Sequence, residues 1–222
     1  MLKLSSINKQ YNDFYALKDI DLQIDDGEFV AIVGESGSGK STLLNIVGQI
    51  DVPSSGELLI NGTNTVKLAE KEVAKLRNTT FGFVFQSFYL EPSYTVEQNV
   101  EIPLILKGTK KEERRSRIVE VLTAVNMQDK RKNISANLSG GEMQRVAIAR
   151  AIAADPSIII ADEPCGNLDS KNGEAIMKLL KSLNDCGKTV IMVTHSAEHA
   201  QWAKRIIRLC DGKVISDVSN AN

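Results

Sequence analysis

The stretch Gly34-Glu35-Ser36-Gly37-Ser38-Gly39-Lys40-Ser41-Thr42 constrains the fold of this chain more than any other feature. It matches the pattern G-x-x-x-x-G-K-[ST] in full. The apolar run 29–33 precedes it and reads as a buried strand, and residues 41–47 continue as a helix. Glycines let successive backbone N–H groups turn inward, which makes an anion-binding concavity at the start of a helix. The pattern therefore predicts a strand, a phosphate-binding loop and a helix.

Two side chains of this loop have a chemistry of their own. Lys40 is expected to reach the β- and γ-phosphates of a nucleotide, and the Ser41 hydroxyl is expected to bind Mg²⁺. The strand-loop-helix context makes an accidental match of the pattern far less common. The sequence thus predicts ATP and Mg²⁺ as cofactors.

An acidic pair follows a second apolar run. Residues 158–161 read as a buried parallel strand, and such strands deliver functional groups at their C-terminal ends. Asp162 is suited to hold the Mg²⁺ shell, because a hard cation prefers oxygen ligands. Glu163 is then free to polarise an attacking water. The alternative is a structural acidic turn before Pro164.

Between these two elements lies Leu138-Ser139-Gly140-Gly141-Glu142. Apolar residues recur at helical spacing after it, and Ser139 can serve as the N-cap of that helix. The N–H groups and dipole of such a helix start attract phosphate. Taken alone, the stretch is equally well read as an ordinary helix cap.

Together these residues resemble the nucleotide-binding subunit of an ATP-binding cassette (ABC) transporter, over nearly the whole chain. The resemblance implies that residues 138–142 are the signature motif, which contacts the γ-phosphate of ATP held by a second copy. Two ATP molecules would then join a head-to-tail dimer. It also implies that Tyr11 stacks on adenine, that Gln86 is the Q-loop residue near the metal and the water, that Asn167-Leu168-Asp169 is the D-loop, and that His195 is the switch histidine.

Each of the single residues has a plainer alternative. Tyr11 can be simple packing, Gln86 a polar strand end, and His195 a core histidine. His195 to His199 also fit H-x-x-E-H, a zinc-peptidase pattern. That mechanism needs both histidines on one helical face, whereas His195 follows the apolar run 189–194, which reads as strand.

Composition fits a single substantial core. The chain has 222 residues, 42% of them hydrophobic, and a net charge of −1 with dispersed Lys and Arg, which gives no electrostatic case for nucleic acid. No apolar run approaches the ~18 residues of a membrane span, so a transport pathway is expected in another chain. The three scattered cysteines, Cys165, Cys186 and Cys210, suggest reduced thiols in the cytoplasm, and the reactivity of Cys165 stays open.

The pattern along the chain predicts one ABC nucleotide-binding domain over residues 1–222, of the α/β class. Alternation in residues 1–30 and the Asn61-Gly62 turn predict an antiparallel β subdomain beside a mainly parallel P-loop NTPase core. From about 87 to 137 the pattern turns helical, with an apolar stripe at Ile118, Val121, Leu122 and Val125. This α-helical subdomain is expected to be an insertion that links the Q-loop to the signature motif. Asp211-Gly212 predicts a last hairpin.

Further stretches are similar to the group of macrolide and peptide exporters, lipoprotein-releasing ATPases and the division protein FtsE. The resemblance implies an ATPase on the inner face of the cell membrane that drives a separate integral membrane permease for peptide or antimicrobial export or lipoprotein release. Cys165, Ser135 and Ser196 depart from the usual threonine, proline and aspartate of that pattern. Two alternatives are a regulatory ATPase of the division type, which moves no substrate, and a soluble cassette that acts on DNA or ribosomes. The latter is disfavoured because it usually has a long coiled-coil insertion or two cassettes.

Overall fold

The computed structural model describes residues 1–220, which fall into two compact units. Met1–Arg77 and the chain from Leu183 onward form the first, here called the sheet unit, and Asn78–Ser182 form the second, the helical unit. The boundaries fall inside two helices, α2 (Glu70–Thr80) and α6 (Ser170–Asp185). Within the described residues, no helix combines the length and apolar character that a membrane span needs.

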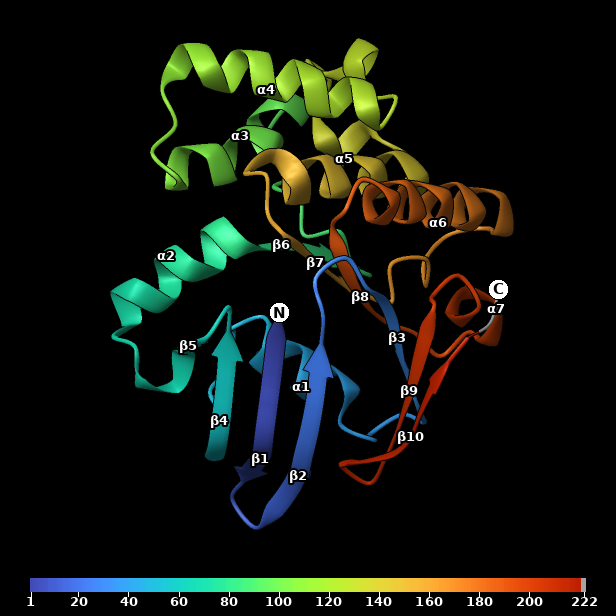
Figure 1. Ribbon diagram of the computed structural model, residues 1–222. Coiled ribbons are helices and arrows are strands. Elements are labelled where there is room, and N and C mark those ends of the chain that lie inside the picture. Colours follow the sequence, from blue (N-terminus) through green and yellow to red (C-terminus); the bar gives the residue numbers. More distant parts are fainter. Residues whose placement is uncertain (221–222) are drawn as a thin grey trace. The chain divides into compact units, whose positions relative to one another are not determined.

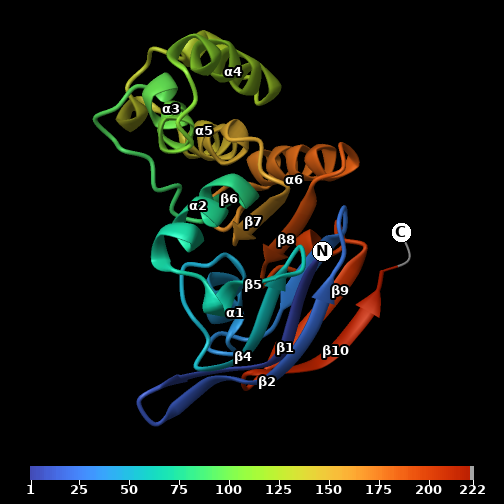
Figure 2. The same cartoon turned by 60° about the vertical axis from the view of Figure 1, so that its left-hand side comes forward.

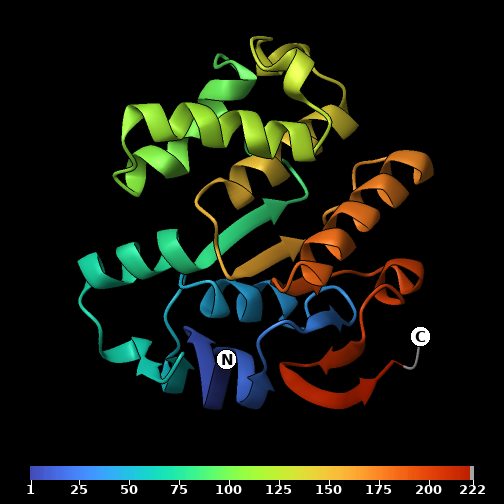
Figure 3. The ribbon, with the colours of Figure 1, turned by 45° about the horizontal axis from the view of Figure 1, so that its top comes forward.

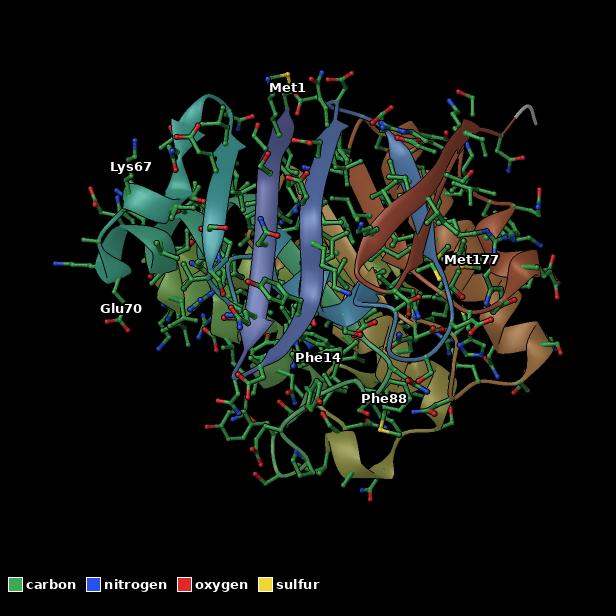
Figure 4. The ribbon with its side chains drawn as sticks, turned by 90° about the horizontal axis from the view of Figure 1, so that it is seen from below. Met1, Phe14, Lys67, Glu70, Phe88 and Met177 are labelled. Carbon is green, nitrogen blue, oxygen red and sulfur yellow. The ribbon has the colours of Figure 1, made fainter. Side chains whose placement is uncertain are left out.

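An antiparallel sheet in the sheet unit has the strand order β2-β1-β4-β5 (Figure 2). Its members are β1 (Leu2–Tyr11), β2 (Phe14–Ile24), β4 (Ser55–Ile60) and β5 (Thr63–Asn64). The turn between β4 and β5 has φ of 49° at Asn61 and 81° at Gly62, as a type I′ hairpin requires. The predicted hairpin is confirmed. Figure 4 shows Phe14 where β1 turns into β2, with its side chain 63% exposed.

Parallel pairing organises the rest of the sheet unit. Strand β3 (Phe29–Val33) pairs in parallel with β8 (Thr189–Val193) and with β9 (Arg205–Cys210), and β9 pairs antiparallel with β10 (Lys213–Ser219). Helix α1 (Lys40–Val47) packs against β2 and β8, with buried Leu43, Leu44, Ile46 and Val47. The short helices are η1 (Thr65–Lys67) and α7 (Ala197–Ala200). The strand and helix expected on either side of the glycine-rich loop are therefore present.

Two short parallel strands, β6 (Phe81–Phe85) and β7 (Ile158–Asp162), run side by side in the helical unit (Figure 3). Helix α5 (Gly140–Ala153) packs on β6, and α3 (Val96–Leu106) and α4 (Lys111–Ala124) pack on α5 (Figure 1). The 3-10 turns η2 (Gln128–Lys130) and η3 (Ser135–Asn137) lie between α4 and α5. The predicted apolar stripe is buried throughout, from 0% exposed at Leu122 to 7% at Ile118.

Gly82 on β6 is a place where α5 and the strand meet with no room for a side chain. A Cβ there would lie 2.4 Å from the carbonyl oxygen of Ala151. We expect Gly82→Ala to lower the free energy of unfolding by ~1–3 kcal/mol, because backbone on both sides must shift. Urea unfolding followed by circular dichroism measures this. Ser116→Ala on the exposed face of α4 is the control, and equal midpoints for the two variants would contradict the close packing.

Candidate functional site

The glycine-rich loop leaves the C-terminal end of β3 and is bounded by the backbone of two neighbouring strands. A Cβ at Gly34 would lie 2.3 Å from the carbonyl oxygen of Leu209, at the end of β9. A Cβ at Gly39 would lie 2.5 Å from that of Ala16 on β2, and Gly39 has φ of 102°. Only glycine satisfies both the space and the conformation at Gly39. The loop is thus held in one shape before α1 begins at Lys40.

Polar groups inside the loop suit an anion. The Lys40 Nζ donates to the carbonyl oxygens of Gly34 at 2.9 Å and Glu35 at 2.7 Å. The Ser38 hydroxyl is buried, and its oxygen has no hydrogen-bond partner within residues 1–220. A buried hydroxyl without a partner is costly, whereas a phosphate oxygen would satisfy it. The residues present therefore fit the nucleotide phosphates that the sequence predicts.

His195 follows β8, the strand beside β3. The parallel register pairs Ile32 with Val193, so the loop after β3 and the segment that contains His195 begin at the same end of the two strands. Ser196 is the N-cap of α7 and accepts a hydrogen bond from the backbone N–H of His199. His195 consequently lies before the helix that contains His199, unlike the paired histidines of a zinc peptidase.

Tyr11, at the end of β1, is held by two neighbours. Its hydroxyl donates to Asp51 Oδ2 at 2.6 Å, and Lys9 Nζ lies 4.8 Å from its ring centre. Lys9 also forms an ion pair with Asp51 Oδ1 at 2.6 Å. The hydrogen bond to the Asp51 carboxylate raises the pKa of Tyr11. The ring is 45% exposed and fixed in orientation, as a stacking platform must be. The sequence gives no sign of this partner, which lies 40 residues away.

In the helical unit, the register of β6 and β7 sets Phe85 opposite Asp162. Gln86 directly follows β6 and Glu163 directly follows β7, so both residues lie at the same end of this strand pair. Gln86 Nε2 donates to Asn167 Oδ1 at 3.2 Å, and Asn167 Nδ2 returns a bond to the Gln86 carbonyl at 3.0 Å. Glu163 has φ of 47°, a conformation that costs energy outside glycine and is common at functional sites.

Helix α5 begins within the predicted signature motif, and Ser139 is its N-cap, as expected. The carboxylate of Glu142 accepts the Ser139 backbone N–H at 2.9 Å and forms an ion pair with Lys130 of η2. The Lys130 ammonium, and next the Ser139 N–H, lower the pKa of Glu142 to about 2. Asp169 accepts bonds from the backbone N–H and side-chain amide of Asn172, which lower its pKa.

Two polar side chains of α5, one buried and one partly exposed, hold the main chain around Gln86. The fully buried Gln144 donates to the carbonyls of Phe85 at 3.3 Å and Pro164 at 2.5 Å. Arg150 donates to the carbonyls of Phe88, at 2.7 Å, and Tyr89. Phe88 and Tyr89 have φ of 61° and 47°, so Arg150 stabilises an unfavourable turn. Sequence reasoning missed both roles, because helical periodicity does not reveal which main-chain atoms a polar side chain meets.

Comparisons of the sequence and of the structure with known proteins point to the same family. The family profile described as "ABC transporter" matches residues 17–166. The ABC transporter ATP-binding protein MJ0796 of Methanocaldococcus jannaschii is 50% identical, over 96% of this chain and 95% of its own length. A dimeric structure of MJ0796 in a post-hydrolysis state with ADP and Pi has a TM-score of 0.92 at 47% identity, with all of both chains covered.

Two further relatives are similar over most of this chain. The ABC transporter ATP-binding protein YknY of Bacillus subtilis is 44% identical over 97% of this chain and 95% of its own length. The macrolide export ATP-binding/permease protein MacB of Brucella melitensis is 46% identical over 99% of this chain. The match spans only 34% of the length of that MacB.

The environment of the three cysteines predicts their reactivity. Cys165 is buried, and burial, with the nearby Glu163 charge, raises the pKa of its thiol to about 12. Cys186 and Cys210 are exposed. We expect an aromatic disulfide reagent at pH 8 to titrate two thiols in the native protein and a third only after unfolding, because the thiolate is the reactive form. Rapid native labelling of Cys165, detected by mass spectrometry, would contradict this.

Replacement of Arg150 tests its hold on the turn at Phe88 and Tyr89. Arg150→Lys keeps the charge but cannot donate two bonds in the same fork geometry. We expect a loss of ~1–3 kcal/mol in unfolding free energy and faster chymotrypsin cleavage after Phe88 and Tyr89. Arg115→Lys on exposed α4 is the matched control. Unchanged cleavage in Arg150→Lys would show that other contacts hold this turn.

Proposed function

Because the chain belongs to the ATP-binding subunits of the ABC transporter family, whose general activity is ATP hydrolysis, we propose that it hydrolyses ATP as a dimer and drives a membrane permease. The observation that carries the proposal is the glycine-rich loop, fixed by backbone contacts at Gly34 and Gly39 and lined by the unpartnered Ser38 hydroxyl. A rigid loop at a helix N-terminus binds phosphate without having to be ordered first.

We propose that the nucleotide is held by residues of the sheet unit. Backbone N–H groups of residues 34–42 bind the phosphates, and Lys40 exchanges its bonds to loop carbonyls for bonds to phosphate oxygens. Tyr11 stacks on adenine, with its orientation set by Asp51 and Lys9. Stacking of a base on an aromatic ring is worth ~1–3 kcal/mol and tolerates different bases. His195 hydrogen-bonds the γ-phosphate.

The chemical step is assigned to a few oxygen and nitrogen atoms. Ser41, Asp162 and Gln86 would hold a Mg²⁺ ion, which when bound supplies positive charge against the phosphate oxygens. Glu163 orients and polarises the attacking water. Asn167 fixes Gln86 from the predicted D-loop through two hydrogen bonds. Backbone strain at Glu163 fits a carboxylate that is positioned for a reaction.

We propose a dimer because the start of α5 has groups that can bind phosphate. In this proposal they bind the nucleotide that is held by the glycine-rich loop of a second copy. Gly140 and Gly141 present backbone N–H groups at the positive end of a 14-residue helix. The main chain of this motif, residues 138–142, then contacts the γ-phosphate held by the partner's loop, and Asp169 belongs to the D-loop of the same arrangement. The dimeric MJ0796 structure with ADP and Pi supports a shared site of this kind.

A membrane permease is the proposed second partner. MacB, whose name joins an ATP-binding and a permease function, is matched over only 34% of its length, so most of that protein lies outside the match. The sheet unit also has a groove of about 400 Å³ with exposed apolar residues around it, Ile50, Val52 and Val66. Contiguous exposed apolar surface is typical of protein interaction sites. The chain would then lie on the cytoplasmic face of the cell membrane.

For the transported substrate, we propose peptide or antimicrobial export or lipoprotein release. The similarity to MacB, which is named for macrolide export, supports antimicrobial export among these. The alternative is a regulatory ATPase that signals through a membrane protein without transport. Co-purification identifies the membrane partner, and vesicles that contain both proteins are then assayed for ATP-dependent accumulation of macrolide, peptide or lipoprotein. ATPase activity without accumulation of any of the three would favour the regulatory function.

The role of Glu163 gives the direct test of ATP hydrolysis in a dimer. We expect Glu163→Gln to lower the turnover number by ~10²–10⁴-fold, the usual contribution of a positioned base. ATP binding remains, so ATP and Mg²⁺ should convert the variant to a stable dimer in sedimentation experiments. Glu113→Gln, on exposed α4, is the control. Unchanged turnover in Glu163→Gln, or a protein that stays monomeric with ATP, would contradict the proposal.

A further inference from the structure

Glu142 brings a negative charge into the segment that is proposed to meet phosphate. It is the third residue of α5, and its side chain is only 18% exposed. Its carboxylate accepts the Ser139 backbone N–H, an interaction that stabilises the helix start. The same charge opposes the approach of a nucleotide phosphate to the N-terminus of the helix, because like charges repel at short range.

Lys130 offsets that charge. Its ammonium pairs with Glu142 Oε1, whereas Ser139 binds the other carboxylate oxygen, so both oxygens of Glu142 have a donor. The pKa of Glu142, about 2, means that the carboxylate is ionised at every physiological pH. The Glu142 charge is therefore present whenever a nucleotide approaches, and the Lys130 ammonium lies against it.

The segment that carries Lys130 is fixed to the rest of the helical unit. The backbone carbonyls of Arg131 and Asn133 accept the N–H groups of Glu97 and Val96, at the start of α3. The carbonyl of Lys130 itself accepts the N–H of Asn133 at 2.9 Å. Lys130 thus extends toward Glu142 from a turn whose backbone is hydrogen-bonded to the start of α3.

We propose that Lys130 is a positioning residue for the ATP-dependent dimer: it pairs with Glu142 and so keeps the N-terminus of α5 electropositive toward the phosphate of the partner's nucleotide. The inference rests on the proposed role of residues 138–142. A purely structural ion pair predicts a different result. Removal of Lys130 would then change the stability of the fold, and removal of the Glu142 charge would not restore the dimer affinity of Lys130→Ala.

The experiment uses the full chain with Glu163→Gln as parent, because that substitution is expected to preserve the ATP dimer. Lys130→Ala, Glu142→Gln and the double variant are added to it, and the dimer dissociation constant with ATP and Mg²⁺ is measured by sedimentation. Glutamine at 142 keeps the acceptor for the Ser139 N–H without the charge. Lys178→Ala, which breaks an exposed ion pair with Glu174 on α6, is the matched control. Thermal unfolding is recorded for each protein.

We expect Lys130→Ala to weaken the dimer about tenfold at low salt, with the defect reduced near 1 M NaCl, where the Debye length is about 3 Å. Glu142→Gln should restore the affinity of Lys130→Ala to within about twofold of the parent. A normal dimer in Lys130→Ala, or no rescue by Glu142→Gln, would overturn the inference and leave the proposed function intact. A parent that fails to dimerise with ATP would overturn both.

Discussion

The helical unit depends on polar side chains of α5 that donate hydrogen bonds to main-chain carbonyls. Gln144 joins the end of β6 to the turn after β7, and Arg150 holds the carbonyls of Phe88 and Tyr89. Gln144 is fully buried, and a buried carbonyl that loses its donor costs about 1–3 kcal/mol. The contacts of both side chains hold the chain on either side of Gln86. The helix that begins with the proposed signature motif therefore also fixes the segment that contains Gln86, and the two are expected to move as one body.

In the sheet unit, the comparable constraint is parallel register. Pairing of β3 with both β8 and β9 brings the glycine-rich loop, His195 and the end of β9 to one edge, because parallel strands end together. The Leu209 carbonyl then lies so close to Gly34 that no side chain fits at that position of the loop. Strand order therefore brings together residues that are far apart in the sequence, without the need for a specific side-chain contact.

Much of this organisation could be predicted from the sequence, since it depends on local patterns. The run 29–33, the Asn61-Gly62 turn and the stripe from Ile118 to Val125 each specify their own conformation, and each was found as predicted. The hydrogen bonds that Tyr11 donates to Asp51 and that Lys130 donates to Glu142 were not predictable, because they join segments whose separation in space depends on the whole fold. Composition and periodicity do not encode such pairs.

Three acidic residues near the proposed phosphate-binding segments, Asp51, Asp169 and Glu142, share one electrostatic feature. Asp51 has Lys9 and Tyr11, Asp169 has Asn172, and Glu142 has Lys130 and the Ser139 N–H as donors. Each carboxylate is thus compensated locally by its own neighbours. A nucleotide that carries several negative charges would otherwise meet additional negative charge at each of these places. Local compensation allows carboxylates to cap helices and orient a ring while the N–H groups of the loop and of α5 remain available to attract phosphate.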